Sequence, residues 1–133
     1  MQDYAVGQMN QLLTTLAFQV HRASARPGPK EIHDLRVSIR RFSQGLLLFS
    51  RLLPKRTIKK ISRRLKRMMQ VTSEIRNRDI AIEFVGGTQH AGHRQRLEEE
   101  RTTYQREFSD LLRRWNARDF SAKWRSDLSL SSV

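Results

Sequence analysis

Apolar residues recur along most of this chain at alternating spacings of three and four positions, which is the period of a helix that buries one face. The clearest example, between two prolines, is the run Ile32, Leu35, Ile39, Phe42, Leu46, Phe49 and Leu53. No segment stands out as alternating apolar and polar residues in the way that a half-buried strand does. The pattern therefore predicts an all-α protein.

Prolines and glycines divide this pattern into four long helices and a short tail. A Pro-Gly-Pro break follows the first helix, Pro54 closes the second, and a glycine-rich stretch separates the third from the fourth. Long helices joined by short loops pack antiparallel, so the expected fold is an antiparallel four-helix bundle. We expect a single domain over residues 1–133, with helices at 1–24, 29–53, 55–85 and 92–117 and an amphipathic helical tail at 118–133.

The sequence makes a specific prediction about packing on the first and third helices. On the first helix, either Leu12 or Leu13 belongs to the buried stripe. On the third helix, Asp79 falls on the apolar face and has Arg76 and Arg78 as neighbours. A buried carboxylate needs a charged partner, so we interpret Arg78 and Asp79 as a structural ion-pair site that holds two helices in register.

Basic residues are concentrated in one part of the chain. The sequence has 26 Lys and Arg against 13 Asp and Glu, a formal net charge of +13 at pH 7. Residues 22–78 carry 17 of these bases and only three acids. Most of the bases are arginines, whose planar guanidinium groups grip phosphate oxygens in pairs. A basic block folded onto one face predicts a polyanionic partner.

The helical period places many of these bases on matching flanks of the second and third helices. Two antiparallel helices with such flanks can form the walls of one basic groove. On the second helix this flank holds His33, Arg36, Arg40 and Arg51, and Arg41 lies further round toward solvent. On the third helix it holds Lys55, Lys59, Arg63 and Lys66, with Arg56, Lys60 and Arg67 beside them.

The sequence lacks the residues that several classes of protein need for their function. The chain has no cysteine, which excludes disulfides and thiolate metal sites. No apolar run approaches the ~18 residues of a membrane-spanning helix. His90 and His93 precede three glutamates at 98–100, the nearest thing to a metal site, but those glutamates spread around a helix. We expect no metal, no cofactor and no catalytic residue, and hence a protein that is not an enzyme.

Two other classes of binding protein remain as alternatives to a protein that binds one particular polyanion. Sequence-nonspecific binding of a nucleic-acid backbone is the main alternative. Against it, Phe42, Phe49, Tyr104, Phe108 and Trp115 fall on expected core positions, which leaves few rings for bases to stack on. A purely structural interaction module is the other alternative. It predicts that replacing the groove arginines changes no partner's affinity.

Residues 31–42, EIHDLRVSIRRF, resemble the signature of the CHAD family, the conserved histidine α-helical domains. A histidine and three arginines in the spacing H-x-x-R-V-x-x-R-R are improbable by chance. A Leu-Leu-Pro break, a basic third helix and the pair Arg78-Asp79 follow in the family's order. The resemblance covers residues 1–85 closely and the fourth helix by pattern.

The resemblance implies a helical bundle that binds inorganic polyphosphate through its basic residues, without catalysis. The eight binding residues that it implies here are His33, Arg36, Arg40, Arg41, Lys59, Arg63, Lys66 and Arg67. It also implies a cytoplasmic protein associated with polyphosphate granules, and a functional link to a CYTH-type triphosphate enzyme. Typical members have two pseudo-symmetric four-helix halves, and this chain supplies one. We therefore expect it either to form a homodimer or to bind more weakly alone. The family's usual R-D-x-D reads here as Arg78-Asp79-Ile80-Ala81, with Ile75 in place of a glycine.

Overall fold

The computed structural model describes residues 2–86 and 91–130. Within these ranges the chain contains helices and no strand, which confirms the predicted all-α class. The elements are α1 (Gln2–Ala25), α2 (Pro29–Leu48), the 3₁₀ turn η1 (Ser50–Leu52), α3 (Lys55–Phe84), α4 (Ala91–Ala117) and α5 (Phe120–Asp127).

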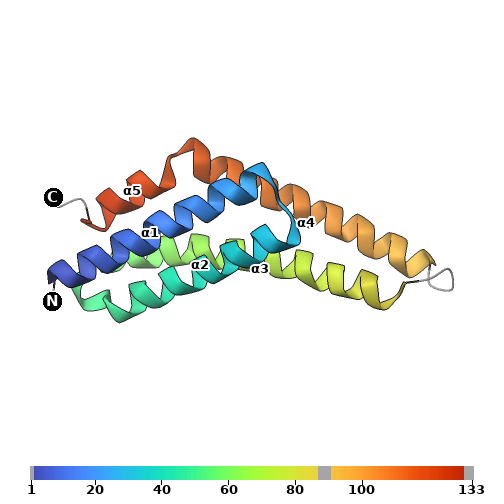
Figure 1. Cartoon of the computed structure of the whole chain (residues 1–133), viewed down its shortest axis with the longest axis horizontal. Coiled ribbons are helices and arrows are strands. Elements are labelled where there is room, and N and C mark those ends of the chain that lie inside the picture. Colours follow the sequence, from blue (N-terminus) through green and yellow to red (C-terminus); the bar gives the residue numbers. More distant parts are fainter. Residues whose placement is uncertain (1, 87–90, 131–133) are drawn as a thin grey trace.

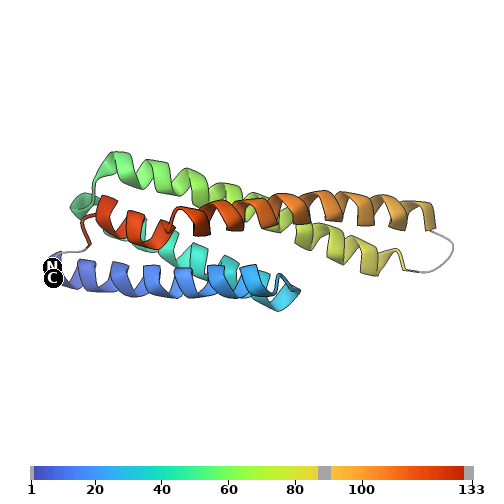
Figure 2. The same ribbon diagram turned by 90° about the horizontal axis from the view of Figure 1, so that it is seen from above.

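The helices form two antiparallel hairpins that pack on one another. α1 packs along α2, and α3 packs along α4, while α2 and α3 share a smaller contact. Figures 1 and 2 show that α3 and α4 continue well beyond the α1–α2 hairpin. At the opposite end, α5 follows α4 and lies beside α1. The bundle is therefore closed at the end where α1 begins, and α3 and α4 extend alone at the other.

The second helix ends earlier than the sequence pattern predicts. α2 stops at Leu48, and the chain passes through η1 before Pro54. Leu53 has extended dihedrals (φ −119°, ψ 153°), because the residue before a proline is disfavoured in the helical region. Phe49 consequently lies outside α2, where its half-buried ring meets Tyr4 edge-on at a centroid distance of 6.3 Å. The other three long helices match the prediction to within one or two residues.

The core is aliphatic along the bundle and aromatic beneath α5. Of the two leucines that the sequence left open on α1, Leu13 is fully buried and Leu12 is only partly buried. Phe42 of α2 stacks on Trp124 of α5, with ring centroids 5.9 Å apart and planes 13° from parallel. The C-terminal tail expected from the sequence is thus a helix that contributes to the core. Its buried residues are Phe120 and Trp124, followed by Leu128 and Leu130.

Phe42→Ala tests whether this aromatic contact joins α5 to the bundle. Phe42 is completely buried, and its truncation leaves a cavity beside Trp124. We expect the free energy of unfolding, measured by urea denaturation, to fall by about 3–5 kcal/mol. Phe84→Ala is the matched control, because that ring is 90% exposed, and it should change stability by less than about 0.5 kcal/mol. Equal losses in the two variants would contradict this account of the core.

Candidate anion-binding surface

Arg36 joins α2 to α3. Its Nη1 donates to the carbonyl oxygen of Met69 at 2.8 Å and to Thr72 Oγ1 at 2.7 Å. Thr72 is fully buried, and its hydroxyl donates in turn to the carbonyl oxygen of Met68. The Nε of Arg36 is buried without a hydrogen-bond partner. The guanidinium is therefore held in the seam between the two helices.

Positive charge gathers around this guanidinium. Burial lowers the pKa of Arg36, and the nearby cations Arg40 and Arg76 lower it further. Arg40 and Arg76 are both exposed, and within the described residues neither takes part in an ion pair. The three arginines consequently repel one another with no carboxylate between them.

Other bases share this edge of the bundle by helical register. At 100° per residue, Lys66 and Arg76 lie within about 60° of Met69 around α3, and Lys59 lies about 80° away. His33 precedes Arg36 by one turn on α2. Apart from the half-buried Arg36, all of these side chains are exposed. We name this set the α2–α3 flank; it consists of His33, Arg36, Arg40, Lys59, Lys66 and Arg76.

The acids of the basic segment pair elsewhere. Glu31 and Asp34 of α2 both bind Arg22 of α1, at 3.6 and 3.0 Å. Glu74, the third acid among residues 22–78, pairs with Arg78 on the side of α3 that faces α4. In the part of the chain that the structure describes, the bases of the α2–α3 flank therefore have no ion-pair partner.

Two of the eight predicted binding residues do not join this flank. Arg41 lies on the α1 side of α2, where it lines a cavity together with Tyr4 and Leu12. Arg67 forms an ion pair with Glu107 of α4. The prediction of one groove that holds all eight bases is thus wrong for these two, because α2 and α3 each have a second helix on their other flank.

Arg63, the remaining predicted residue, borders a second basic hollow, of about 300 Å³, between α3 and α4. Sequence reasoning missed this cluster because Arg114 lies on α4 and Arg118 in the turn after it, both outside the basic segment. It also missed Arg76, although the spacing 66, 69, 73, 76 places that residue on the flank of Lys66. The hollow is lined by Arg63, Arg64, Arg67, Leu111, Arg114, Trp115 and Arg118.

Arg78 and Asp79 both form ion pairs with residues of α4, but they do not pair with one another. Asp79 accepts a hydrogen bond from Nε of Arg101 on α4. Arg78 Nε lies 3.3 Å from Glu100 Oε1, and its guanidinium lies over the ring of Tyr104, 4.9 Å from the centroid. Partial burial opposes the charge of Arg78, but its two carboxylate partners raise its pKa overall.

On metals and membranes, the structural findings concern the described residues only. No three His, Asp or Glu side chains gather there in a way that could hold a metal ion. His93 is exposed near the start of α4, and His90 lies outside the described residues. No helix in the described ranges is both long and apolar enough to cross a membrane.

Comparison with protein families gives one result that decides the relationship. The model of the CHAD domain matches residues 13–131 of this 133-residue chain. The chain belongs to the CHAD family. The match extends through α4 and α5, beyond the part in which the sequence resemblance is close. Comparisons with curated proteins and with solved structures find no match.

A double-mutant cycle on Asp79→Asn and Arg101→Gln tests the ion pair between α3 and α4 of this CHAD domain. Both side chains are about one-third exposed, so solvent screens the interaction. We expect a coupling energy of about 0.5–1 kcal/mol from urea denaturation, decreasing with salt. The exposed Asp110–Arg113 pair within α4 is the control and should couple by less than about 0.5 kcal/mol. Strict additivity of Asp79→Asn and Arg101→Gln would show that the pair contributes nothing to the register of α3 and α4.

Proposed function

We propose that this CHAD domain binds inorganic polyphosphate along the α2–α3 flank and does not turn it over. The observation that carries the proposal is the environment of Arg36. Its guanidinium is fixed between two helices by Met69 and Thr72, and burial and two further cations lower its pKa. An anion placed there relieves the repulsion and meets donors that are already positioned.

The chemistry of polyphosphate suits such a surface. It is a flexible chain with about one negative charge per phosphate and without bases to be read, so a line of cationic donors is sufficient for binding. Guanidinium groups offer paired N–H donors to phosphate oxygens. Binding releases counterions, and the affinity should therefore fall steeply as salt rises.

The distribution of aromatic rings favours polyphosphate over nucleic acid. Single-stranded nucleic acids are bound largely by stacking of bases on exposed rings beside cations. The exposed rings of Tyr4 and Phe18 lie on α1, and Phe84 lies two turns of α3 beyond Arg76. Both tryptophans and three of the phenylalanines are buried in the core: Trp115, Trp124, Phe42, Phe108 and Phe120.

Family membership supports the remaining parts of the proposal. As a binding module, the chain would attach to polyphosphate granules in the cytoplasm and act beside a CYTH-type triphosphate enzyme. A homodimer would supply a second flank to the same polymer. Measurement of molecular mass in solution during a titration with polyphosphate tests ligand binding and dimerisation together.

The double variant Arg40→Ala/Lys66→Ala tests the proposed surface. Both side chains are exposed, so the fold should be retained. We expect the affinity for long-chain polyphosphate at 0.15 M NaCl, measured by calorimetry, to fall about ten-fold or more. The slope of log K against log salt should decrease by roughly 1.4, at about 0.7 for each phosphate that the variant no longer neutralises.

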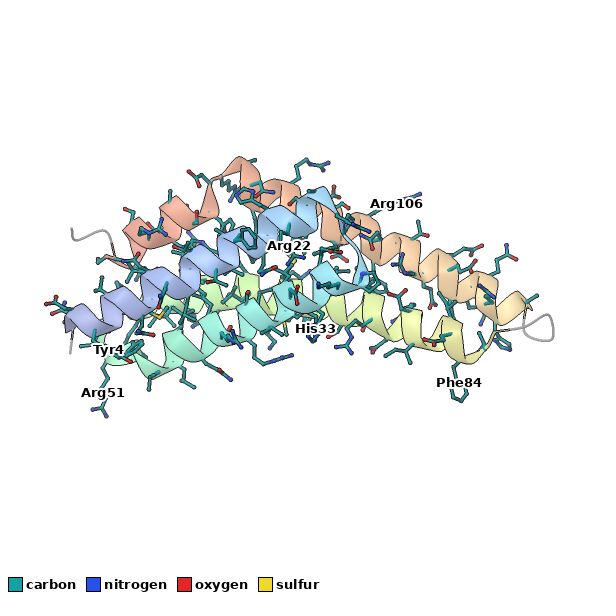
Figure 3. All side chains as sticks on the ribbon, viewed as in Figure 1. Tyr4, Arg22, His33, Arg51, Phe84 and Arg106 are labelled. Carbon is teal, nitrogen blue, oxygen red and sulfur yellow. The ribbon has the colours of Figure 1, made fainter. Side chains whose placement is uncertain are left out.

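Arg26→Ala/Arg106→Ala is the matched control. It removes two exposed positive charges as well, and Figure 3 shows Arg106 on α4 at the opposite edge of the view from His33. Its affinity should stay within about two-fold of the parent. Equal losses in both double variants would show that only net charge matters. Tighter binding of duplex DNA in the same buffer would favour the nucleic-acid alternative, and release of phosphate by pure protein would contradict a purely binding role.

A further inference from the structure

A cavity of about 670 Å³ opens between the first turns of α1 and the end of α2. Its apolar wall consists of Tyr4, Leu12, Leu48, Phe49 and Leu52. Figure 3 shows Tyr4 near the start of α1, at the same end of the molecule as Arg51 and far from Phe84. The cavity thus lies at the closed end of the bundle, on the side of α2 that faces α1 rather than α3.

Local backbone features explain why the cavity exists. Gly45 allows α1 and α2 to approach closely, since a Cβ there would lie 2.8 Å from Cδ1 of Leu12 and from Sδ of Met9. α2 then ends at Leu48, and η1 carries the chain away toward α3. The edge-on contact between Tyr4 and Phe49 forms one boundary of the space that remains.

The rim of the cavity is cationic. Arg41 and Arg51 both line it, together with the amides of Gln8 and Gln44, and no Asp or Glu of the described residues does. Both arginines are exposed, and neither is in an ion pair within the described residues.

The apolar wall of the cavity remains open to water. Leu48 is 75% exposed, Tyr4 61% and Leu52 44%. An open apolar wall beside two uncompensated cations is complementary to a ligand that has both an apolar body and a negative charge.

We propose that this cavity binds a free single-chain acyl carboxylate. The chain lies against Leu12, Leu48 and Leu52, and the carboxylate lies between Arg41 and Arg51. The cavity volume falls within the roughly 300–1,000 Å³ of small-molecule sites. A helix of a partner protein fits less well, because two turns of a cylinder about 10 Å across occupy roughly 850 Å³. This assignment gives Arg41 a role apart from the α2–α3 flank and does not depend on polyphosphate binding.

Two adjacent residue pairs on α2 provide matched variants. Arg40 and Arg41 carry the same charge, but only Arg41 lines the cavity. Leu47 and Leu48 are 77% and 75% exposed, but only Leu48 lines it. We expect calorimetry with sodium dodecanoate, below its micellar concentration and in 0.15 M NaCl, to show one site per chain. Arg41→Ala and Leu48→Ser should each weaken binding about five-fold or more, whereas Arg40→Ala and Leu47→Ser should change it by less than about two-fold.

Further titrations distinguish an acyl carboxylate site from nonspecific detergent binding and from a protein-docking surface. Dodecyltrimethylammonium should not bind, because it carries the wrong charge, and Arg41→Ala should leave polyphosphate affinity within about two-fold. Equal effects within each matched pair, or binding of many dodecanoates per chain, would overturn the proposal. So would an absence of dodecanoate binding combined with Leu48-dependent binding of a synthetic acidic amphipathic helix, which would make the cavity a protein-docking surface.

Discussion

Ion pairs between helices, within residues 2–86 and 91–130, join α1 to α2 and α3 to α4, and none joins α2 to α3. Arg22 takes both acids of α2, while Arg78 and Asp79 use acids and bases of α4. Each hairpin thus has ion pairs along its own seam, although the α3–α4 seam also contains the basic hollow beside Arg63 and Arg114. The rest of the structure depends on this distribution, because no ion pair within the described residues compensates the cations along the contact between α2 and α3.

The surroundings of Arg36 illustrate this excess of positive charge at the contact between α2 and α3. It crosses the α2–α3 seam by donating to a backbone carbonyl and a threonine hydroxyl, both of which are neutral acceptors. These acceptors bind only its Nη1 and do not cancel its charge, its Nε has no partner, and Arg40 and Arg76 add to the repulsion. We propose that a polyanion supplies the missing counter-charge. Arg41 does not belong to this group of cations, because it lines the cavity on the α1 side of α2, beside an apolar wall.

The sequence was sufficient for the helices and for most of the core, since the three-and-four spacing of residues such as Leu35 and Leu65 follows directly from helical geometry. It could not settle which neighbour each basic flank would meet. Arg63 and Arg67 lie on α3 close to Lys66 in sequence, yet they face α4 because a helix turns 100° per residue and α3 has neighbours on two sides. The end of α2 at Leu48 and the stacking of Phe42 on Trp124 likewise depend on tertiary contacts that no local pattern specifies.

The most direct measurement of the central claim is an NMR titration with long-chain polyphosphate that follows the arginine Nε–Hε resonances. Arginines that have no ion pair with a carboxylate should bind phosphate first. The resonances of Arg36, Arg40 and Arg76 should therefore shift together at low polyphosphate concentration. Arg22 and Arg78, which are held by carboxylates, should shift little. Equal shifts of all five, or larger shifts of Arg22 and Arg78, would contradict the account.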